Sequence, residues 1–295
     1  MKYIPKNQTI AIMQPYFLPY IGYFQLINAV DSFVIYDNIE YSKKSWVNRN
    51  RFLQNNKDCL FSLPLRKDSD FLHIDKRYLS DSFNPSKILD SLHFAYRKAP
   101  HYNSLMPLLE SIFSYPRENL FDFIYHSILL ICRYLEIKSN IFISSCIDIN
   151  HSLKSKDKVI SICKALNATS YINPIGGIGL YFNDDFKREN INLRFLETNG
   201  NLIYRQFEND FVPNLSIIDI IAFNDIAQIK QLLLQYKLID SIKNAENSAM
   251  GGGSRYYLII FLYDYYRLIT LTLLFYIFYH SINSINLTTR TNYAR

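Results

Sequence analysis

One stretch of the chain gathers many of the side chains that could carry chemistry. Residues 36–52, YDNIEYSKKSWVNRNRF, place two acidic, four basic and several amide side chains around Trp46, the single tryptophan. Arg49 and Arg51 carry planar guanidinium groups, which bind phosphate or carboxylate through paired hydrogen bonds. Lys43 adds a mobile positive charge, and the tryptophan ring can stack on a sugar or a base. The stretch therefore predicts an anion-binding site, with a surface loop anchored by one buried tryptophan as the alternative.

A second stretch, rich in aromatic residues, follows the first apolar run. Residues 13–24, MQPYFLPYIGYF, contain two prolines, one glycine and five aromatic residues. Proline restricts the backbone, and Gly22 allows a close approach, so the pattern is typical of a stiff turn before a closely packed helix. Tyr16, Tyr20 and Tyr23 either line a pocket at this turn or cap the core, and both interpretations stay open.

The order of apolar and amphipathic segments predicts an α/β fold. A strand at 9–13, a helix at 20–28 and a strand at 31–37 form a βαβ unit, whose crossover implies a parallel sheet. Further helices are expected at 85–96, 100–114, 118–135 and 156–166, and further strands at 140–144, 169–173 and 191–197. The expected architecture is a Rossmann-like parallel sheet flanked by helices, with a C-terminal hydrophobic helical tail. Both stretches described above follow strands, where ligands of such sheets bind.

Composition limits the ligands that are expected. The 295 residues are 49% hydrophobic and 20% charged, as in a globular protein. The net charge of +6 is spread along the chain, so no DNA partner is expected. Cys59, Cys132, Cys146 and Cys163 lack CxxC spacing and are interpreted as reduced core residues, so no metal site is predicted. The glycines at 176–179 form no complete dinucleotide or P-loop fingerprint, and the cofactor stays unknown.

The chain is expected to divide into four regions. Residues 1–240 form one α/β domain, and residues 241–255, with three glycines, are typical of a linker. Residues 256–282 are apolar and long enough to cross a bilayer as a helix, and residues 283–295 are a disordered end. The apolar segment is either an anchor in the inner membrane or a non-native ending. No secretory signal is evident at the amino terminus, so a cytoplasmic location is expected.

Several motifs carry a resemblance to a known family. MQPYFLPYIGYFQLI, DSFVIYDNIEYSKKSWVNRNRF, YRKAPHY, KVISICKALNATSYINPIGGIGLY and FVPNLSIIDIIAFN occur in the order and spacing of the WbqC-like protein family. The resemblance runs from Ile10 to Asp240, and its first two motifs are the most specific. It implies a bacterial protein of O-antigen or other surface-polysaccharide biosynthesis. Some members of this family are assigned as transferases that place glycine or another small acyl group on a nucleotide-linked amino sugar.

The resemblance also implies a set of site residues. They are Gln14, Pro15, Tyr16, Pro19, Gly22 and Tyr23 in the first motif, and Asp37, Tyr41, Lys43, Trp46, Asn48, Arg49, Asn50 and Arg51 in the second. Tyr20 stands where many relatives carry tryptophan and joins the substrate-binding candidates. The segment NPIGGIGLY replaces a Ser-Gly turn that is common in the family, so the resemblance assigns no ligand to that loop.

Acyl transfer to a sugar amine would assign roles to these residues. The reaction needs a base for the ammonium, donors for the developing oxyanion and cations for the diphosphate. Asp37, at a strand end, is the candidate base, although a loop cap is its alternative role. Lys43 and Asn48 are candidate oxyanion donors, together with Asn50, and Arg49 and Arg51 are candidate phosphate ligands.

Three functions stay open on the sequence. The first is a transferase whose partners are a nucleotide-linked amino sugar and an acyl donor that the sequence does not identify. The second is a non-catalytic nucleotide-sugar-binding or scaffold protein of the same pathway. The third is nucleotidyl transfer, because the turn at 19–23, PYIGY, resembles the P-H-x-G-H turn of nucleotidylyltransferases. The tyrosines at the histidine positions argue against this third function.

Overall fold

The structure is a computed structural model that describes residues 5–43, 45–69, 71–116, 118–200, 202–207 and 210–240. The expected linker at 241–255, the apolar segment at 256–282 and the end at 283–295 lie outside these residues. Within the described part of the chain, no helix has both the length and the apolar character needed to cross a membrane.

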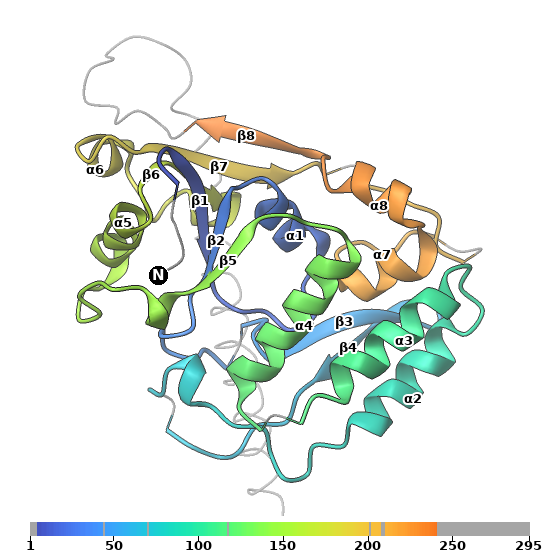
Figure 1. Ribbon diagram of the computed structural model, residues 1–295. Helices are drawn as coiled ribbons and strands as arrows, with labels where there is room; N and C mark the ends of the chain where they lie inside the picture. The colour runs from blue at the N-terminus through green and yellow to red at the C-terminus, as the bar shows by residue number, and fades with distance from the viewer. Residues whose placement is uncertain are drawn as a thin grey trace, which may run out of the picture. The chain divides into compact units, whose positions relative to one another are not determined.

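Six strands of the described chain form one sheet, in the order β5-β2-β1-β6-β7-β8 (Figure 1). They are β1 (Gln8–Met13), β2 (Ser32–Ile35), β5 (Asn140–Ile143), β6 (Ala168–Pro174), β7 (Asn192–Thr198) and β8 (Tyr236–Asp240). The first five are parallel to their neighbours, and β8 runs antiparallel to β7. This mostly parallel sheet, flanked by helices, confirms the predicted α/β fold.

Strand β1 lies where the winding of the sheet reverses. From β1 the chain passes through α1 (Ile21–Asn28) to β2 on one side, whereas β6 pairs with β1 on the other side. In open α/β sheets, ligands bind beyond the carboxyl ends of the strands at such a reversal. A ligand site is therefore expected at the carboxyl ends of β1 and β6.

Helices cover both faces of the sheet. On one face, α5 (Ser155–Ala165) and α6 (Asn183–Lys187) pack on a core that receives Ile10 and Ile12 of β1. On the other face, α1 packs on a core that receives Ala11, since side chains alternate along a strand. That larger core also receives α2 (Pro85–Tyr96), α3 (Tyr102–Phe113), α4 (Leu120–Tyr134), α7 (Ile217–Phe223) and α8 (Ile226–Leu232). Three short 3₁₀ turns are η1 (Ile74–Lys76), η2 (Ser144–Cys146) and η3 (Ile175–Gly177).

A hairpin is present where the sequence showed no regular period. Strand β3 (Arg49–Gln54) pairs antiparallel with β4 (Lys57–Ser62). Asn55 and Asn56 join the strands with φ of 50° and 62°. Two-residue hairpin loops need this left-handed conformation, and asparagine tolerates it better than most residues. The hairpin thus places the basic residues at the start of β3 on a regular strand.

Candidate functional site

A cavity of about 510 Å³ lies at the carboxyl ends of β1, β6 and β7; we call it the first cavity. Eight of the predicted site residues line it: Tyr16, Pro19, Tyr20, Gly22, Tyr23, Trp46, Asn50 and Arg51. Glu197 and Thr198, at the end of β7, contribute further polar groups. The lining is otherwise mainly apolar, which is typical of sites that bind small molecules.

The helix after the first turn packs closely against β7. A Cβ atom added at Gly22 would lie 2.8 Å from the Thr198 hydroxyl oxygen, nearer than real Cβ atoms approach. Thr198 in turn donates a 2.7 Å hydrogen bond to Gln25, whose buried amide nitrogen donates to the carbonyl of Leu232 at 2.8 Å. Glycine at position 22 therefore permits the close approach that the sequence suggested.

The tyrosines of the first cavity are neutral hydroxyl groups. Burial raises the pKa of Tyr16 and Tyr20. Burial also raises the pKa of Tyr23 well above its usual value, and the nearby Tyr16 adds to this shift. The Tyr23 hydroxyl donates to the carbonyl of Gln14 at 3.0 Å. At neutral pH Tyr16 and Tyr20 can therefore donate hydrogen bonds to a ligand, whereas the Tyr23 proton already binds the Gln14 carbonyl. None of the three side chains can supply a phenolate base.

Trp46 and two arginines form an aromatic and cationic wall. The guanidinium carbons of Arg49 and Arg51 lie 5.6 and 5.2 Å from the centroid of the Trp46 ring. Arg51 forms a 3.0 Å ion pair with Asp58, and its Nε atom is buried without a hydrogen-bond partner. The Arg51 side chain is 33% exposed and lines the first cavity, so the accessible part of its guanidinium group can contact an anionic ligand there.

Asn50 holds the first turn against the hairpin. Its side-chain nitrogen donates to the carbonyls of Phe17 and Leu18 at 3.0 and 2.7 Å. The Leu18 carbonyl also accepts a 2.6 Å bond from Ser216, which caps α7. Leu18 has a φ of 45°, which is strained for a branched side chain. The two hydrogen bonds therefore hold a strained residue of the loop that forms one wall of the first cavity.

Other predicted residues lie beside the cavity and do not line it. Tyr41 donates a 2.8 Å hydrogen bond to Asn48, whose amide donates to the carbonyl of Leu63 at 2.8 Å. The Arg49 Nε atom donates to the carbonyl of Ser45 at 3.1 Å, and Lys43 is exposed in the loop before it. Asn48 thus connects this loop to the end of the hairpin, and its part in catalysis stays a prediction.

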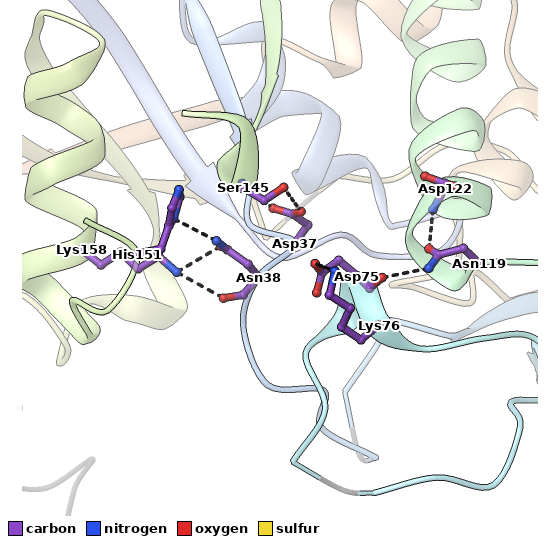
Figure 2. Close-up of polar contacts among 9 residues, drawn as sticks. All are labelled: Asp37, Asn38, Asp75, Lys76, Asn119, Asp122, Ser145, His151 and Lys158. Atoms are coloured by element: carbon purple, nitrogen blue, oxygen red, sulfur yellow. Dashed lines mark hydrogen bonds and ion pairs between the residues drawn. The ribbon is translucent and has the colours of Figure 1, made fainter. Parts of the chain in front are cut away.

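Asp37, the candidate base, is buried and bonded to a neighbouring segment (Figure 2). Its carboxylate accepts hydrogen bonds from the Ser145 backbone nitrogen at 2.9 Å and from the Ser145 hydroxyl at 2.5 Å. Ser145 lies in η2, directly after β5, so this carboxylate joins the ends of two neighbouring strands. Asp37 does not line the first cavity.

A buried lysine continues this polar network. Lys158 of α5 donates to the backbone carbonyl and the side-chain oxygen of Asn38 at 3.2 and 3.1 Å. Burial lowers the pKa of Lys158, whereas the charges of Asp37 and Asp75 act in the opposite direction. His151 contacts the amide of the same Asn38 at 3.0 Å (Figure 2). The network therefore fastens α5 to the segment that follows β2.

A second cavity, of about 390 Å³, lies on the α5 side of the sheet edge. Its lining includes Gln14, Tyr36, Tyr171 and Asn173. Gln14 and Tyr16 are the predicted site residues that it receives. The candidates therefore divide between two cavities, with Pro15, Asp37, Tyr41, Lys43, Asn48 and Arg49 outside both linings.

Sequence reasoning missed several lining residues. Glu197 and Thr198 end β7, and Tyr171 and Asn173 lie near the end of β6. Their position at the carboxyl ends of predicted parallel strands could have identified them, because these strand ends lie along one edge of a sheet. The order of the strands was needed to place them beside the first turn.

A metal centre was not expected from the sequence. Within the described residues, no group of three or more His, Cys, Asp or Glu side chains is placed to hold a metal ion.

The chain is an α/β protein with a cavity at the reversal point of its sheet. A model of the WbqC-like protein family matches residues 14–231, and the chain belongs to this family. The matched range contains every lining residue of the first cavity except Met13. The chain is 26% identical over 216 residues to the uncharacterized protein Rv1507c of Mycobacterium tuberculosis, covering 72% of this chain and 93% of that protein. No solved structure matches the chain.

Proposed function

We propose that this protein is an enzyme of O-antigen or other surface-polysaccharide biosynthesis. In this proposal it transfers glycine or another small acyl group to an amino sugar linked to a nucleotide that binds in the first cavity. The observation that carries the proposal is the wall formed by Trp46 and Arg51 at the reversal point of the sheet. The membership in the WbqC-like family supports it, because the family resemblance implies this pathway and this substrate class.

The lining of the first cavity suits the two ends of such a ligand. Tyr16, Tyr20 and Trp46 offer aromatic surfaces for a base or a sugar ring. Arg51 lines the cavity with a partly exposed side chain, and a guanidinium group binds phosphate oxygens in a planar, paired geometry. Glu197 is the carboxylate among the lining residues, paired with Lys237 at 2.7 Å.

The proposed reaction is a nucleophilic substitution at the carbonyl carbon of the acyl donor. The amine nitrogen of the sugar attacks the carbonyl carbon of an activated acyl donor, such as a thioester or an ester. A C–N bond forms, the bond to the leaving group breaks, and the leaving group departs with the electron pair. One proton of the amine goes to a base. Asp37 remains the base predicted from the sequence, and Glu197 is a second candidate because it lines the first cavity.

The test is binding of a nucleotide-linked amino sugar to the full chain, measured by calorimetry with UDP- and dTDP-linked 4-amino sugars. Arg51→Ala should weaken binding by at least about tenfold, since a charged hydrogen bond to phosphate is lost. Arg66→Ala is the matched control, because Arg66 is also ion-paired, with Asp81 at 2.8 Å, and lies over the ring of Tyr78. Equal affinities of wild type and Arg51→Ala would contradict the proposed site.

A non-catalytic nucleotide-sugar-binding or scaffold protein of the same pathway is the second candidate. This second function is favoured because several polar side chains that line the first cavity are already bonded to other residues of the protein. Asn50 is bonded to the first turn, Thr198 to Gln25, and Glu197 to Lys237. Wild-type binding of the nucleotide sugar, without turnover with any activated glycine donor, would support this second function.

A further inference from the structure

The two cavities lie on opposite sides of one strand end. The first cavity is on the face covered by α1, and the second is on the face covered by α5. Met13, Tyr16 and Pro174 line both of them. These three residues follow or end β1 and β6, the strands between which the winding reverses. A ligand that lies across Tyr16 and Pro174 can therefore extend into both cavities.

The second cavity differs from the first in charge. Its described lining contains no Asp, Glu, Lys or Arg, whereas Arg51 and Glu197 line the first cavity. Its polar groups are the carboxamides of Gln14 and Asn173 and four tyrosine hydroxyls. A phosphate would lack a counter-charge among these lining residues, so a sugar ring matches this cavity better than a diphosphate does.

The tyrosines of the second cavity are neutral donors and acceptors. Burial raises the pKa of Tyr36 to about 12, and the neighbouring Tyr181 contributes. Burial likewise raises the pKa of Tyr171 and Tyr181. Hydroxyl groups, carboxamides and aromatic ring faces can together bind the hydroxyl groups and the C–H faces of a pyranose ring.

We propose that the second cavity is a subsite for the sugar ring of the ligand whose nucleotide portion occupies the first cavity. This inference rests on the proposed function, which it deepens by naming where the sugar binds. The exposed side chain of Leu180, 70% accessible, stands at the lining of this cavity. The sugar can therefore enter from solvent on that side.

Asn173 and Gly177 provide a sharp test. Asn173 accepts a 3.0 Å hydrogen bond from the Tyr171 hydroxyl, and its side-chain nitrogen lies against Gly177. A Cβ atom at position 177 would be 2.0 Å from that nitrogen, so Gly177→Ala must displace the Asn173 amide. Gly179, two residues further along the same loop, has open space around its added Cβ. Gly179→Ala is therefore a matched control with the same change of side chain.

The experiment compares UDP and dTDP with their 4-amino-sugar conjugates on the full chain, by calorimetry. In the wild type and Gly179→Ala, the sugar should strengthen binding by about tenfold over the diphosphate alone. In Gly177→Ala this gain should be lost, while the affinity for the diphosphate alone changes by less than about twofold. A gain of the same size in Gly177→Ala, or no gain in the wild type, would overturn the sugar subsite.

A second measurement separates this inference from the proposed function. The full chain is labelled with 3-fluorotyrosine, and the resonance of Tyr171 is assigned with Tyr171→Phe. Free N-acetylglucosamine at high millimolar concentration should shift the Tyr171 signal in the wild type and in Gly179→Ala, but not in Gly177→Ala. If no nucleotide binds, the proposed function fails, yet this shift still supports a sugar site. If the nucleotide binds and the shift is absent, the subsite fails alone.

Discussion

The buried hydroxyl of Tyr96 donates a 2.9 Å hydrogen bond to the carboxylate of Asp219. The same hydroxyl accepts the backbone N–H of Leu53, also at 2.9 Å. Tyr204 and Gln206 donate to the other carboxylate oxygen at 2.6 and 2.7 Å. Three side chains thus solvate a carboxylate that is fully buried in α7. Strand β3 contributes Asn50 and Arg51 to the lining of the first cavity, and Leu53 of the same strand is bonded to Tyr96, so this cluster supports the site through β3.

Tyr96→Phe should lower the free energy of unfolding by roughly 2–4 kcal/mol, because a bond to a buried charged group is lost and the Leu53 N–H loses its acceptor. Tyr102→Phe is the control, since the Tyr102 hydroxyl contacts the His93 ring at 2.6 Å in a partly buried place. That control should cost about 0.5–1.5 kcal/mol. Urea unfolding of both variants measures the difference, and equal losses would contradict the role of the cluster.

The effect of Tyr96→Phe should also depend on pH. Burial raises the pKa of Asp219 above its usual 3.8, although the three donors oppose this shift. The folded carboxyl therefore keeps its proton at a higher pH than the unfolded one, and wild-type stability from this group falls as pH rises from 3.8 through the raised folded pKa. Tyr96 favours the charged form, so its loss raises that pKa further. The stability gap between wild type and Tyr96→Phe should widen as pH rises through this window.

Gly22→Ala should strain the contact between α1 and β7. The added methyl group would press on the Thr198 hydroxyl and weaken its bond to the buried Gln25. Overpacking of this kind costs about 1–3 kcal/mol, to be measured by urea unfolding. Gly200→Ala is the control, because its added Cβ meets open space, and it should change stability by less than about 0.5 kcal/mol. A neutral Gly22→Ala would show that position 22 needs no glycine.

The sequence predicted the elements that have an apolar period and missed those that lack one. Strand β1, α1 and β2 were found because two short apolar runs flank a Pro-rich turn and a largely apolar helix. The hairpin was missed because RNRFLQ and KDCLFS carry polar residues on both faces. Strand β8, an edge strand with mostly exposed residues, gave no apolar signal either. Its pairing depends on β7, which only the folded chain places beside it.

Site residues were predictable where they follow a predicted strand closely along the chain. Tyr16, Tyr20 and Tyr23 follow β1 directly, and Trp46 with Arg51 follows β2, so parallel strand ends bring them to one edge. The environment of Asp37 was not predictable, because its partner Ser145 comes from a turn 108 residues further along the chain. That contact exists because β5 pairs with β2, and a single sequence does not contain the strand order.

Asn50→Ala should destabilise the protein and weaken ligand binding together. The variant leaves the carbonyls of Phe17 and Leu18 without the Asn50 donor, at a cost of roughly 1–3 kcal/mol for buried groups. The strained Leu18 would then relax and move the wall of the first cavity. Asn150→Ala, which removes exposed bonds from Ser152, is the control and should cost less than about 0.5 kcal/mol. Urea unfolding and calorimetry with UDP-linked 4-amino sugars measure the two effects.

Two carboxylates compete for the role of base, and paired variants separate them. Glu197 lines the first cavity and is bonded to Lys237, whereas Asp37 is bonded twice to Ser145 outside the lining. Glu197 lines the cavity proposed for the nucleotide portion of the ligand, whereas Asp37 lines neither cavity, so position favours Glu197 as the base. Glu197→Gln should therefore lower kcat for transfer of radiolabelled glycine to a UDP-linked 4-amino sugar by about 10²–10⁴-fold, with little change in unfolding by urea.

Asp37→Asn should behave in the opposite way. Its new amide would face the two Ser145 donors, so the free energy of unfolding should fall by roughly 1–3 kcal/mol. Turnover by the folded fraction of this variant should change far less than that of Glu197→Gln, because Asp37 contacts η2 and not the cavity. A large loss of kcat in Asp37→Asn at unchanged stability would instead support Asp37 as the base, reached through a movement of the segment that follows β2.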